Sequence, residues 1–142
     1  MPLHRQGPAE PTLNRCRLVE GLRVKGRPFR QRLDFAVTGI AEGWRSEPSF
    51  RVEIIVGLAS MIVTAALRPG FLWAAVIAVA IALVLALELI NSALEAVIDH
   101  VHPDAADPIR RAKDMASGAV LAASAGATGV GVLMVLAVAS GG

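Results

Sequence analysis

The feature that most constrains the fold is an uninterrupted apolar run over residues 71–87. The run carries no charged side chain, and its only polar side-chain group is the indole N–H of Trp73. At about 1.5 Å of rise per residue, a helix of this length covers roughly 26 Å, close to the thickness of a bilayer's hydrocarbon core. Two further spans are expected at 50–67, where the residues are purely apolar or small from Ile54 onward, and at 115–139, which is rich in Ala and Gly. The sequence therefore predicts an all-α integral membrane protein with three transmembrane helices.

Composition supports this interpretation. Of the 142 residues, 54% are hydrophobic and only 18% are charged, whereas soluble domains carry about 25% charged residues. We therefore exclude an ordinary soluble domain. The chain is also too short for more than one domain.

Proline and glycine residues set the expected helix boundaries. Pro48 and Pro108 suit the first turns of helices, and the sequence Arg68-Pro69-Gly70 suits a tight turn. The predicted spans are 48–67, 71–99 and 108–139. Because no Gly or Pro interrupts residues 71–102, the second helix is longer than a bilayer requires, and its far end should project into the cytoplasm.

An amphipathic helix is predicted over residues 30–46, before the first span. Leu33, Val37, Ile40 and Trp44 fall on one face of it, with charged residues on the other. Such a helix is typical of the membrane interface. The alternative is a helix that packs within a soluble domain, which is disfavoured because a transmembrane span follows directly. Residues 1–28 show no sustained period and lack the apolar core of a signal peptide. We interpret them as a disordered cytoplasmic tail, and residues 29–142 as the membrane domain.

The basic residues indicate the topology. Most of the fourteen Lys and Arg residues precede residue 52, and three more cluster as Arg110, Arg111 and Lys113. Beside apolar spans, such clusters mark cytoplasmic flanks, so the N-terminus and the 100–114 loop should be cytoplasmic. Aromatic residues do not alternate with the basic residues as they do in nucleic-acid-binding surfaces, so the sequence does not suggest a nucleic-acid partner. Cys16 is the only cysteine and excludes an intrachain disulfide.

Gly118, Ala122 and Gly126 recur every four residues in the third span. Small residues at this spacing let helix backbones approach closely, so we expect tight packing on this face. A generic Ala-rich span is the alternative.

A stripe of polar residues along the end of the second span is the sharpest functional signal. Glu88 follows the apolar run directly, at the level of the inner headgroups. An ionisable residue there costs free energy, so its presence favours a functional role. Four more polar residues share its helical face: Asn91, Ser92, Glu95 and Asp99. The structural alternatives are that these polar residues hold neighbouring helices together, or that this end of the helix is simply exposed to water. For Asp99 alone a structural role is preferred.

The depth of each carboxylate suggests a division of roles. Glu88 and Glu95 are about 10 Å apart along the helix, so they cannot share one ion unless the helix deforms. Glu95 lies nearer the cytoplasm and suits a metal bound to phosphates, with Glu47 able to complete the site, whereas Glu88 suits a group delivered by the membrane. Lys113 offers a charge to polyphosphate. No P-loop, GxGxxG or protein-kinase motif is present.

Two sequence motifs make the chain resemble the prokaryotic diacylglycerol kinase family, which includes undecaprenol kinases. Residues 88–99 read ELINSALEAVID and residues 111–117 read RAKDMAS. The EPSFR segment at 47–51 and the amphipathic helix before it match as well. The resemblance covers about residues 29–139.

The resemblance implies a homotrimer in the bacterial inner membrane, with active sites between subunits at the cytoplasmic face. It implies Mg²⁺- and ATP-dependent phosphorylation of a lipid hydroxyl, with Glu88 as proton acceptor and Glu47 and Glu95 as metal ligands. The resemblance also implies a set of nucleotide and lipid contacts. The implied ATP contacts are Glu47, Glu95, Asn91, Asp104, Lys113, Asp114 and Arg30. The implied lipid contacts are Glu88, Arg51, Ser117 and Trp44.

One departure from the family pattern concerns the implied nucleotide contacts: Asp104 is followed by Ala105 and Ala106, where enterobacterial members carry Tyr-His. The acceptor stays open between diacylglycerol and undecaprenol, because Phe35-Ala36 with Gly39 and the run from Arg45 to Glu47 resemble the undecaprenol kinases equally well. A small multidrug-type transporter is a remote alternative. It would need four spans and an acidic residue early in the first.

Overall fold

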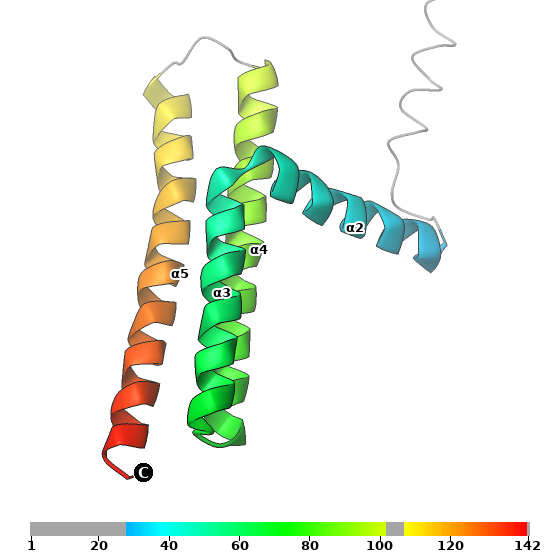
Figure 1. Ribbon diagram of the computed structural model, residues 1–142. Coiled ribbons are helices and arrows are strands. Elements are labelled where there is room, and N and C mark those ends of the chain that lie inside the picture. The colour runs from blue at the N-terminus through cyan, green and yellow to red at the C-terminus, as the bar shows by residue number, and fades with distance from the viewer. Residues whose placement is uncertain (1–27, 102–106, 142) are drawn as a thin grey trace, which may run out of the picture. The chain divides into compact units, whose positions relative to one another are not determined.

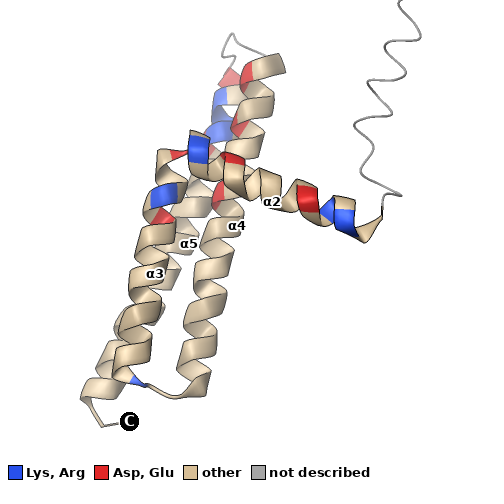
Figure 2. Cartoon of the chain, turned by 45° about the vertical axis from the view of Figure 1, so that its right-hand side comes forward, with Lys and Arg blue, Asp and Glu red and all other residues tan. Residues whose placement is uncertain are grey.

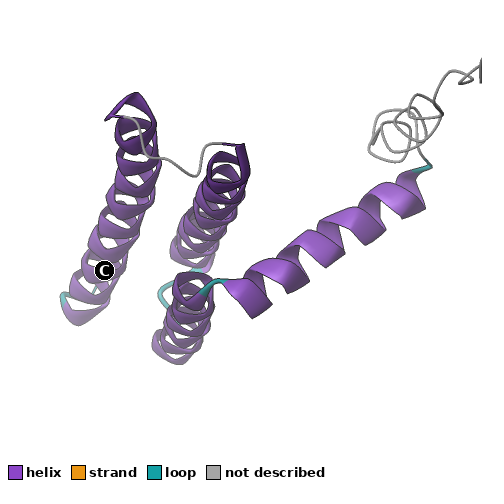
Figure 3. Cartoon of the chain, turned by 90° about the horizontal axis from the view of Figure 1, so that it is seen from above, coloured by secondary structure: helices purple, strands orange, loops and turns teal. Residues whose placement is uncertain are grey.

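The computed structural model describes residues 28–101 and 107–141, and all of its regular structure is helical (Figures 1 and 3). The four helices are α2 (Phe29–Ser46), α3 (Pro48–Leu67), α4 (Phe71–Val101) and α5 (Asp107–Ala139). The chain divides into two compact units at Thr38 and Gly39. The packing described below belongs to the second unit, which holds the last residues of α2 and all of α3–α5. The predicted tail lies outside the described residues except for Pro28.

Three of these helices are long and apolar enough to cross a membrane: α3, α4 and α5. This confirms the predicted all-α fold with three spans. Helix α4 ends two residues beyond the predicted limit of 99, and α5 begins one residue earlier than predicted, at Asp107. The long second helix follows from its sequence, because no residue in it breaks the pattern of backbone hydrogen bonds.

The turn between α3 and α4 uses the predicted residues. Arg68 ends α3 in the left-handed conformation (φ 51°), and its N–H donates to Thr64 O at 3.0 Å, which satisfies one carbonyl at the helix end. Gly70 also has a positive φ (98°) and tolerates it because it has no Cβ. At the other end of α3, Pro48 occupies the first turn, where a missing N–H costs nothing.

Helix α4 packs against both α3 and α5, whereas α3 and α5 meet at few positions. Two glycines mark close approaches to α4: a Cβ added to Gly57 of α3 would come within 2.8 Å of the Ile81 side chain, and one added to Gly43 would come within 2.6 Å of the Leu89 side chain. Phe50 is 2% exposed and lies beside Gly43 in the last part of α2. On α5, Met134 is buried and its sulfur accepts a hydrogen bond from Thr64 at 3.6 Å.

The small-residue face of α5 is not packed within the described chain. A Cβ added to Gly118 or Gly126 would meet nothing within 4 Å. The tight packing expected there is therefore absent among the described helices, whereas Gly57 of α3 lies close against Ile81 of α4. Most large apolar side chains of α3–α5 are likewise exposed, as is normal for helices whose solvent is lipid.

Candidate functional site

The charged residues of the second unit gather at one end of α3–α5, and a long uncharged stretch follows along each helix (Figure 2). The exception is Arg68, in the turn at the opposite end of α3. The first turns of α3 and α5 and the last turns of α4 all contribute to the charged end. Helices of alternating direction therefore bring together residues that lie far apart in the sequence.

Glu88 is the most buried ionisable residue of this group, with a relative exposure of 6%. It lies where the apolar part of α4 ends, and the carboxylates of Glu47 and Glu95 are near enough to act on it electrostatically. Three predicted site residues from two helices thus converge. A buried carboxylate beside two others is a costly arrangement, typical of a site that binds a cation or handles a proton.

Asn91 and Glu95 are joined one turn beyond Glu88. Asn91 Nδ2 donates to Glu95 Oε1 at 3.2 Å, which orients the carboxylate. Asn91 Oδ1 is buried and has no hydrogen-bond partner. An amide oxygen without a partner is available to a ligand that brings a donor or a metal ion.

Lys113 connects α5 to the end of α4. Its Nζ donates to Asp99 Oδ1 at 2.8 Å, and its charge is also felt by Glu95. Asp114 pairs with Arg110 at 3.4 Å on the surface of α5. Lys113 and Asp114 therefore both lie at the charged end and are engaged in ion pairs within the chain.

The carboxylates alone do not form a complete metal site. Within residues 28–101 and 107–141, no group of three or more His, Cys, Asp or Glu side chains could hold a metal ion. Mg²⁺ is commonly held by one or two carboxylates together with water and substrate phosphates. Glu47, whose side chain makes no capping hydrogen bond on α3, and Glu95 would be the two carboxylates available to such a site.

The other predicted contacts are distributed more widely. Arg51 is exposed in the first turn of α3, and Trp44 is 43% exposed near the end of α2. The Ser117 hydroxyl donates to Lys113 O within α5 at 3.1 Å. Arg30 lies at the start of α2, in the first unit. Asp104 lies outside the described residues.

The structure adds Glu53, which the sequence analysis did not single out. Glu53 lies in the second turn of α3, its Oε2 atom is buried, and that atom has no hydrogen-bond partner. Its carboxylate is close enough to Glu88 for the two to repel each other. The available signal was a charged residue inside the predicted span 48–67, directly before the apolar residues that begin at Ile54.

Comparisons with known proteins identify the family. The family described as "Prokaryotic diacylglycerol kinase" matches residues 34–135. The diacylglycerol kinase of Escherichia coli K12 is 33% identical over 85 residues, which are 60% of this chain and 70% of that protein. The diacylglycerol kinase of Synechocystis is 33% identical over 103 residues, 72% of this chain and 59% of that protein. With three spans and the charged end now described, the chain belongs to the prokaryotic diacylglycerol kinase family.

Proposed function

We propose that this protein is a membrane lipid kinase that transfers the γ-phosphate of ATP to the hydroxyl of diacylglycerol and yields phosphatidic acid. Membership in the family and the names of the relatives support lipid phosphorylation. The observation that carries the proposal is the position of Glu88. Its buried carboxylate lies where the apolar part of α4 meets the charged end, so it can meet both a membrane lipid and a nucleotide.

The residues at the charged end have distinct proposed roles. Glu47 and Glu95 would hold Mg²⁺, and Asn91 orients Glu95 through its amide. Lys113, Asp114 and Arg30 are the proposed nucleotide contacts, together with Asp104. The proposed lipid contacts are Arg51, Ser117 and Trp44 around Glu88. When bound, Mg²⁺ neutralises charge on the ATP phosphates.

The proposed reaction is a direct in-line transfer. The oxygen of the lipid hydroxyl forms a bond to the γ-phosphorus, while the bond from that phosphorus to the β–γ bridging oxygen breaks and ADP leaves. Glu88 accepts the hydroxyl proton. Lys113 places a positive charge near the transferred group after exchanging Asp99 for phosphate oxygens. Such a reaction is catalysed chiefly by positioning and electrostatics, which explains how a small helical scaffold suffices.

We further propose that the protein acts as a homotrimer, with the charged end at the cytoplasmic face of the bacterial inner membrane. The basic residues around this end favour a cytoplasmic location. The uncovered small-residue face of α5 provides surface for other copies. In this arrangement α2 would lie along the interface.

The test is phosphate transfer from γ-labelled ATP to a panel of lipid alcohols in mixed micelles. The panel contains diacylglycerol, ceramide and undecaprenol. We expect labelled phosphatidic acid, formed only when Mg²⁺ is present. Preferential labelling of undecaprenol would reassign the acceptor, and no labelling of any lipid would contradict the proposal.

A further inference from the structure

Gly43 occupies a position in α2 that no larger residue could take without a shift of its neighbours. It is the one buried residue among those described in α2. A Cβ added there would lie 2.6 Å from Leu89 Cδ2 on α4 and 3.4 Å from Phe50 Cδ1 on α3. Protein interiors are close-packed, so a side chain at this position must displace at least one of the two neighbours. The last part of α2 therefore packs on α3 and α4 through a contact that depends on glycine.

Hydrogen bonds along the backbone connect this contact to Glu47. The carbonyl of Gly43 accepts a bond from Glu47 N–H at 3.0 Å, and the carbonyl of Glu47 accepts one from Arg51 N–H at 3.4 Å. Glu47 itself has an extended backbone (φ −107°, ψ 107°), so the chain turns at this residue between α2 and α3. Because the bonds on both sides of the turn are made, a displacement of Gly43 should carry Glu47 with it.

Leu89 brings the same contact to the level of the buried carboxylate. It directly follows Glu88 in α4, and Glu88 has Glu47 and Glu95 as electrostatic neighbours. Like charges held close together repel each other, and the repulsion is stronger where water is excluded. Before a cation binds, other contacts must hold the three carboxylates together. The contact of Gly43 with Leu89 lies between the two segments that carry them.

We propose that Gly43 is a positioning residue, and that its contact with Leu89 sets the separation between Glu47 and Glu95 at the charged end. The inference rests on the proposed function, in which these two carboxylates hold Mg²⁺. Glycine suits this role because it lets α2 approach α4 closely, and the geometry of a metal site tolerates only small displacements. Gly43 acts through Glu47 and has no part in the chemistry itself.

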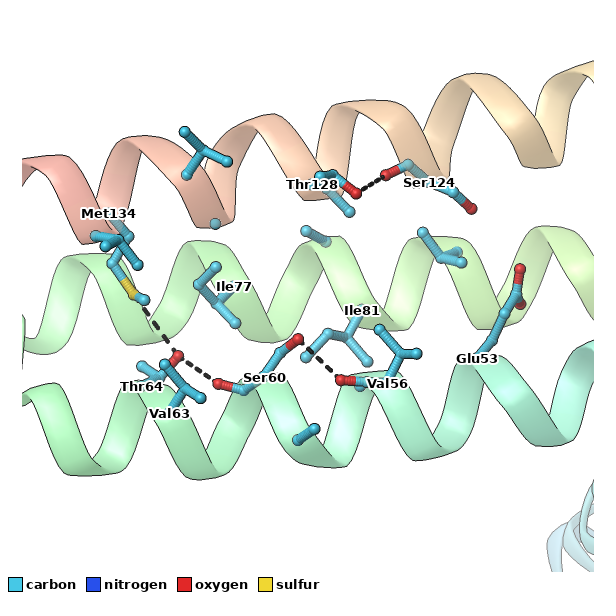
Figure 4. A pocket seen from close by; sticks show the side chains of 18 of the residues that line it. Glu53, Val56, Ser60, Val63, Thr64, Ile77, Ile81, Ser124, Thr128 and Met134 are labelled. Atoms are coloured by element: carbon cyan, nitrogen blue, oxygen red, sulfur yellow. Dashed lines mark hydrogen bonds between the residues drawn. The ribbon is translucent and has the colours of Figure 1, made fainter.

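A second glycine contact limits how far the rest of α3 could follow. Gly57 lies against Ile81, which extends from α4 toward α3 at the side of the cavity between the three spans (Figure 4). Ile81 and Leu89 are eight residues apart in α4, or roughly 12 Å along the helix. Enlarging Gly43 should therefore move the α2–α3 junction and leave the deeper α3–α4 contact in place.

Gly43→Val tests the role, with Gly39→Val as the matched control. Gly39 is also in α2, and a Cβ there meets nothing within 4 Å. In Gly43→Val the Mg²⁺ concentration at half-maximal activity should rise about tenfold or more, as when a residue that orients a metal ligand is lost, while the KM for diacylglycerol changes far less. Gly39→Val should show the wild-type Mg²⁺ titration.

Equal Mg²⁺ titrations for the two variants would overturn the inference, even if Gly43→Val unfolds at a lower temperature, because packing alone would then explain the glycine. If the valine variant does not fold, Gly43→Ala is the smaller enlargement and should shift the titration in the same direction by less.

Shortening Leu89 should rescue the defect if the contact is its cause. Leu89→Ala removes as many side-chain carbon atoms as Gly43→Val adds, so the double variant restores the space between α2 and α4. Its Mg²⁺ titration should lie closer to wild type than that of Gly43→Val, because substitutions at residues in contact are not additive. Defects that simply add would contradict the contact as the cause.

Distance measurements show whether the junction moves, independently of any reaction. Nitroxide labels are placed at Arg45→Cys and Ile90→Cys, both at exposed positions, in full-length Cys16→Ser protein diluted with unlabelled copies. Gly43→Val should lengthen the mean distance between the labels and Leu89→Ala should reverse that change, whereas Gly39→Val should keep the wild-type distance. An unchanged distance in Gly43→Val would refute the inference.

Binding of Mn²⁺ separates this inference from the proposed function. Free Mn²⁺ is followed by EPR in the presence of a non-hydrolysable ATP analogue, so no phosphate transfer is needed. Weaker Mn²⁺ binding by Gly43→Val than by Gly39→Val supports the inference even if none of the proteins phosphorylates a lipid. Phosphate transfer by the wild-type protein together with equal Mn²⁺ affinities of the two variants would refute the inference and leave the proposed function intact.

Discussion

At the scale of single residues, the central feature is a carboxylate that folding alone does not explain. Glu88 is 6% exposed and has Glu47 and Glu95 as electrostatic neighbours, so both desolvation and repulsion act against its charge. No described cation is paired with it. A group retained at such a cost in a membrane helix is best explained by chemistry, and the proposed chemistry is acceptance of the lipid hydroxyl proton.

The first prediction concerns Glu88→Gln, which keeps the shape of the side chain and removes the proton acceptor. General-base catalysis contributes about 10²–10⁴-fold, so turnover should fall by at least about 10²-fold while ATP affinity stays near the wild-type value. Turnover is measured with labelled ATP in mixed micelles, and ATP affinity by equilibrium binding. Glu42→Gln, an exposed glutamate on α2, serves as the control, and wild-type turnover by Glu88→Gln would disprove the role.

A second prediction concerns Glu95, which Asn91 holds by a 3.2 Å hydrogen bond. Glu95→Gln removes one anionic ligand from the proposed metal site, so the Mg²⁺ concentration at half-maximal activity should rise about tenfold or more, within the range that loss of metal-site partners produces. The measurement is activity against Mg²⁺ at saturating ATP and lipid. An unchanged Mg²⁺ titration would remove Glu95 from the site.

Depth along a helix was predictable from the sequence, whereas contacts between helices were not. Glu88 could be identified because it ends a long apolar run, and its spacing to Glu95 is a property of one helix. Glu53 was missed because it directly precedes an apolar run and resembles a flank. Its significance depends on a neighbour on another helix, Glu88, which only the packing of α3 against α4 reveals.

At the scale of the helices, the packing of α3 on α4 depends on one small residue. A Cβ at Gly57 would lie 2.8 Å from Ile81 Cγ2 and 3.8 Å from Ile81 Cγ1, so a larger side chain must push the helices apart or displace a branched side chain. Both residues also line a cavity between α3, α4 and α5.

The third prediction follows from this contact. Gly57→Val should destabilise the protein by about 1–3 kcal/mol, the usual cost of overpacking. The measurement is thermal unfolding in detergent, with Gly39→Val as the control because a Cβ at Gly39 meets nothing within 4 Å. Equal transition temperatures for the two variants would contradict this account of the α3–α4 contact.

The helix boundaries could be predicted from proline and glycine residues in the sequence, but which helices pack against each other could not. Pro48 and the Arg68 turn bound α3 in the structure as expected. The pattern of Gly118 and Gly126 shows that a face of α5 can pack closely, yet it does not specify what packs there, and the described chain leaves this face open. Gly57 carries no repeating pattern, because a single close contact between two apolar helices leaves no periodic signal.

At the scale of the whole molecule, the separation of charged and apolar residues relates the fold to the proposed reaction. The charged end combines parts of α3, α4 and α5, and the long apolar stretches beyond it match a bilayer (Figure 2). A lipid that stays in the membrane and a nucleotide that stays in water can meet only at such a boundary. The topology of the chain therefore decides which compartment supplies the nucleotide, and the proposed use of ATP requires the charged end to be cytoplasmic.

The fourth prediction tests that topology with the single native cysteine. Cys16 precedes α2 and should be cytoplasmic, because basic flanks are retained on that side. In intact spheroplasts, a membrane-impermeant maleimide should leave Cys16 unlabelled, and permeabilisation should expose it. A Cys16→Ser protein that carries Phe71→Cys, at a residue 90% exposed beside the α3–α4 turn, should react without permeabilisation. The reverse pattern would place the charged end outside the cytoplasm, where ATP is not supplied, and the proposed kinase activity would fail together with the topology.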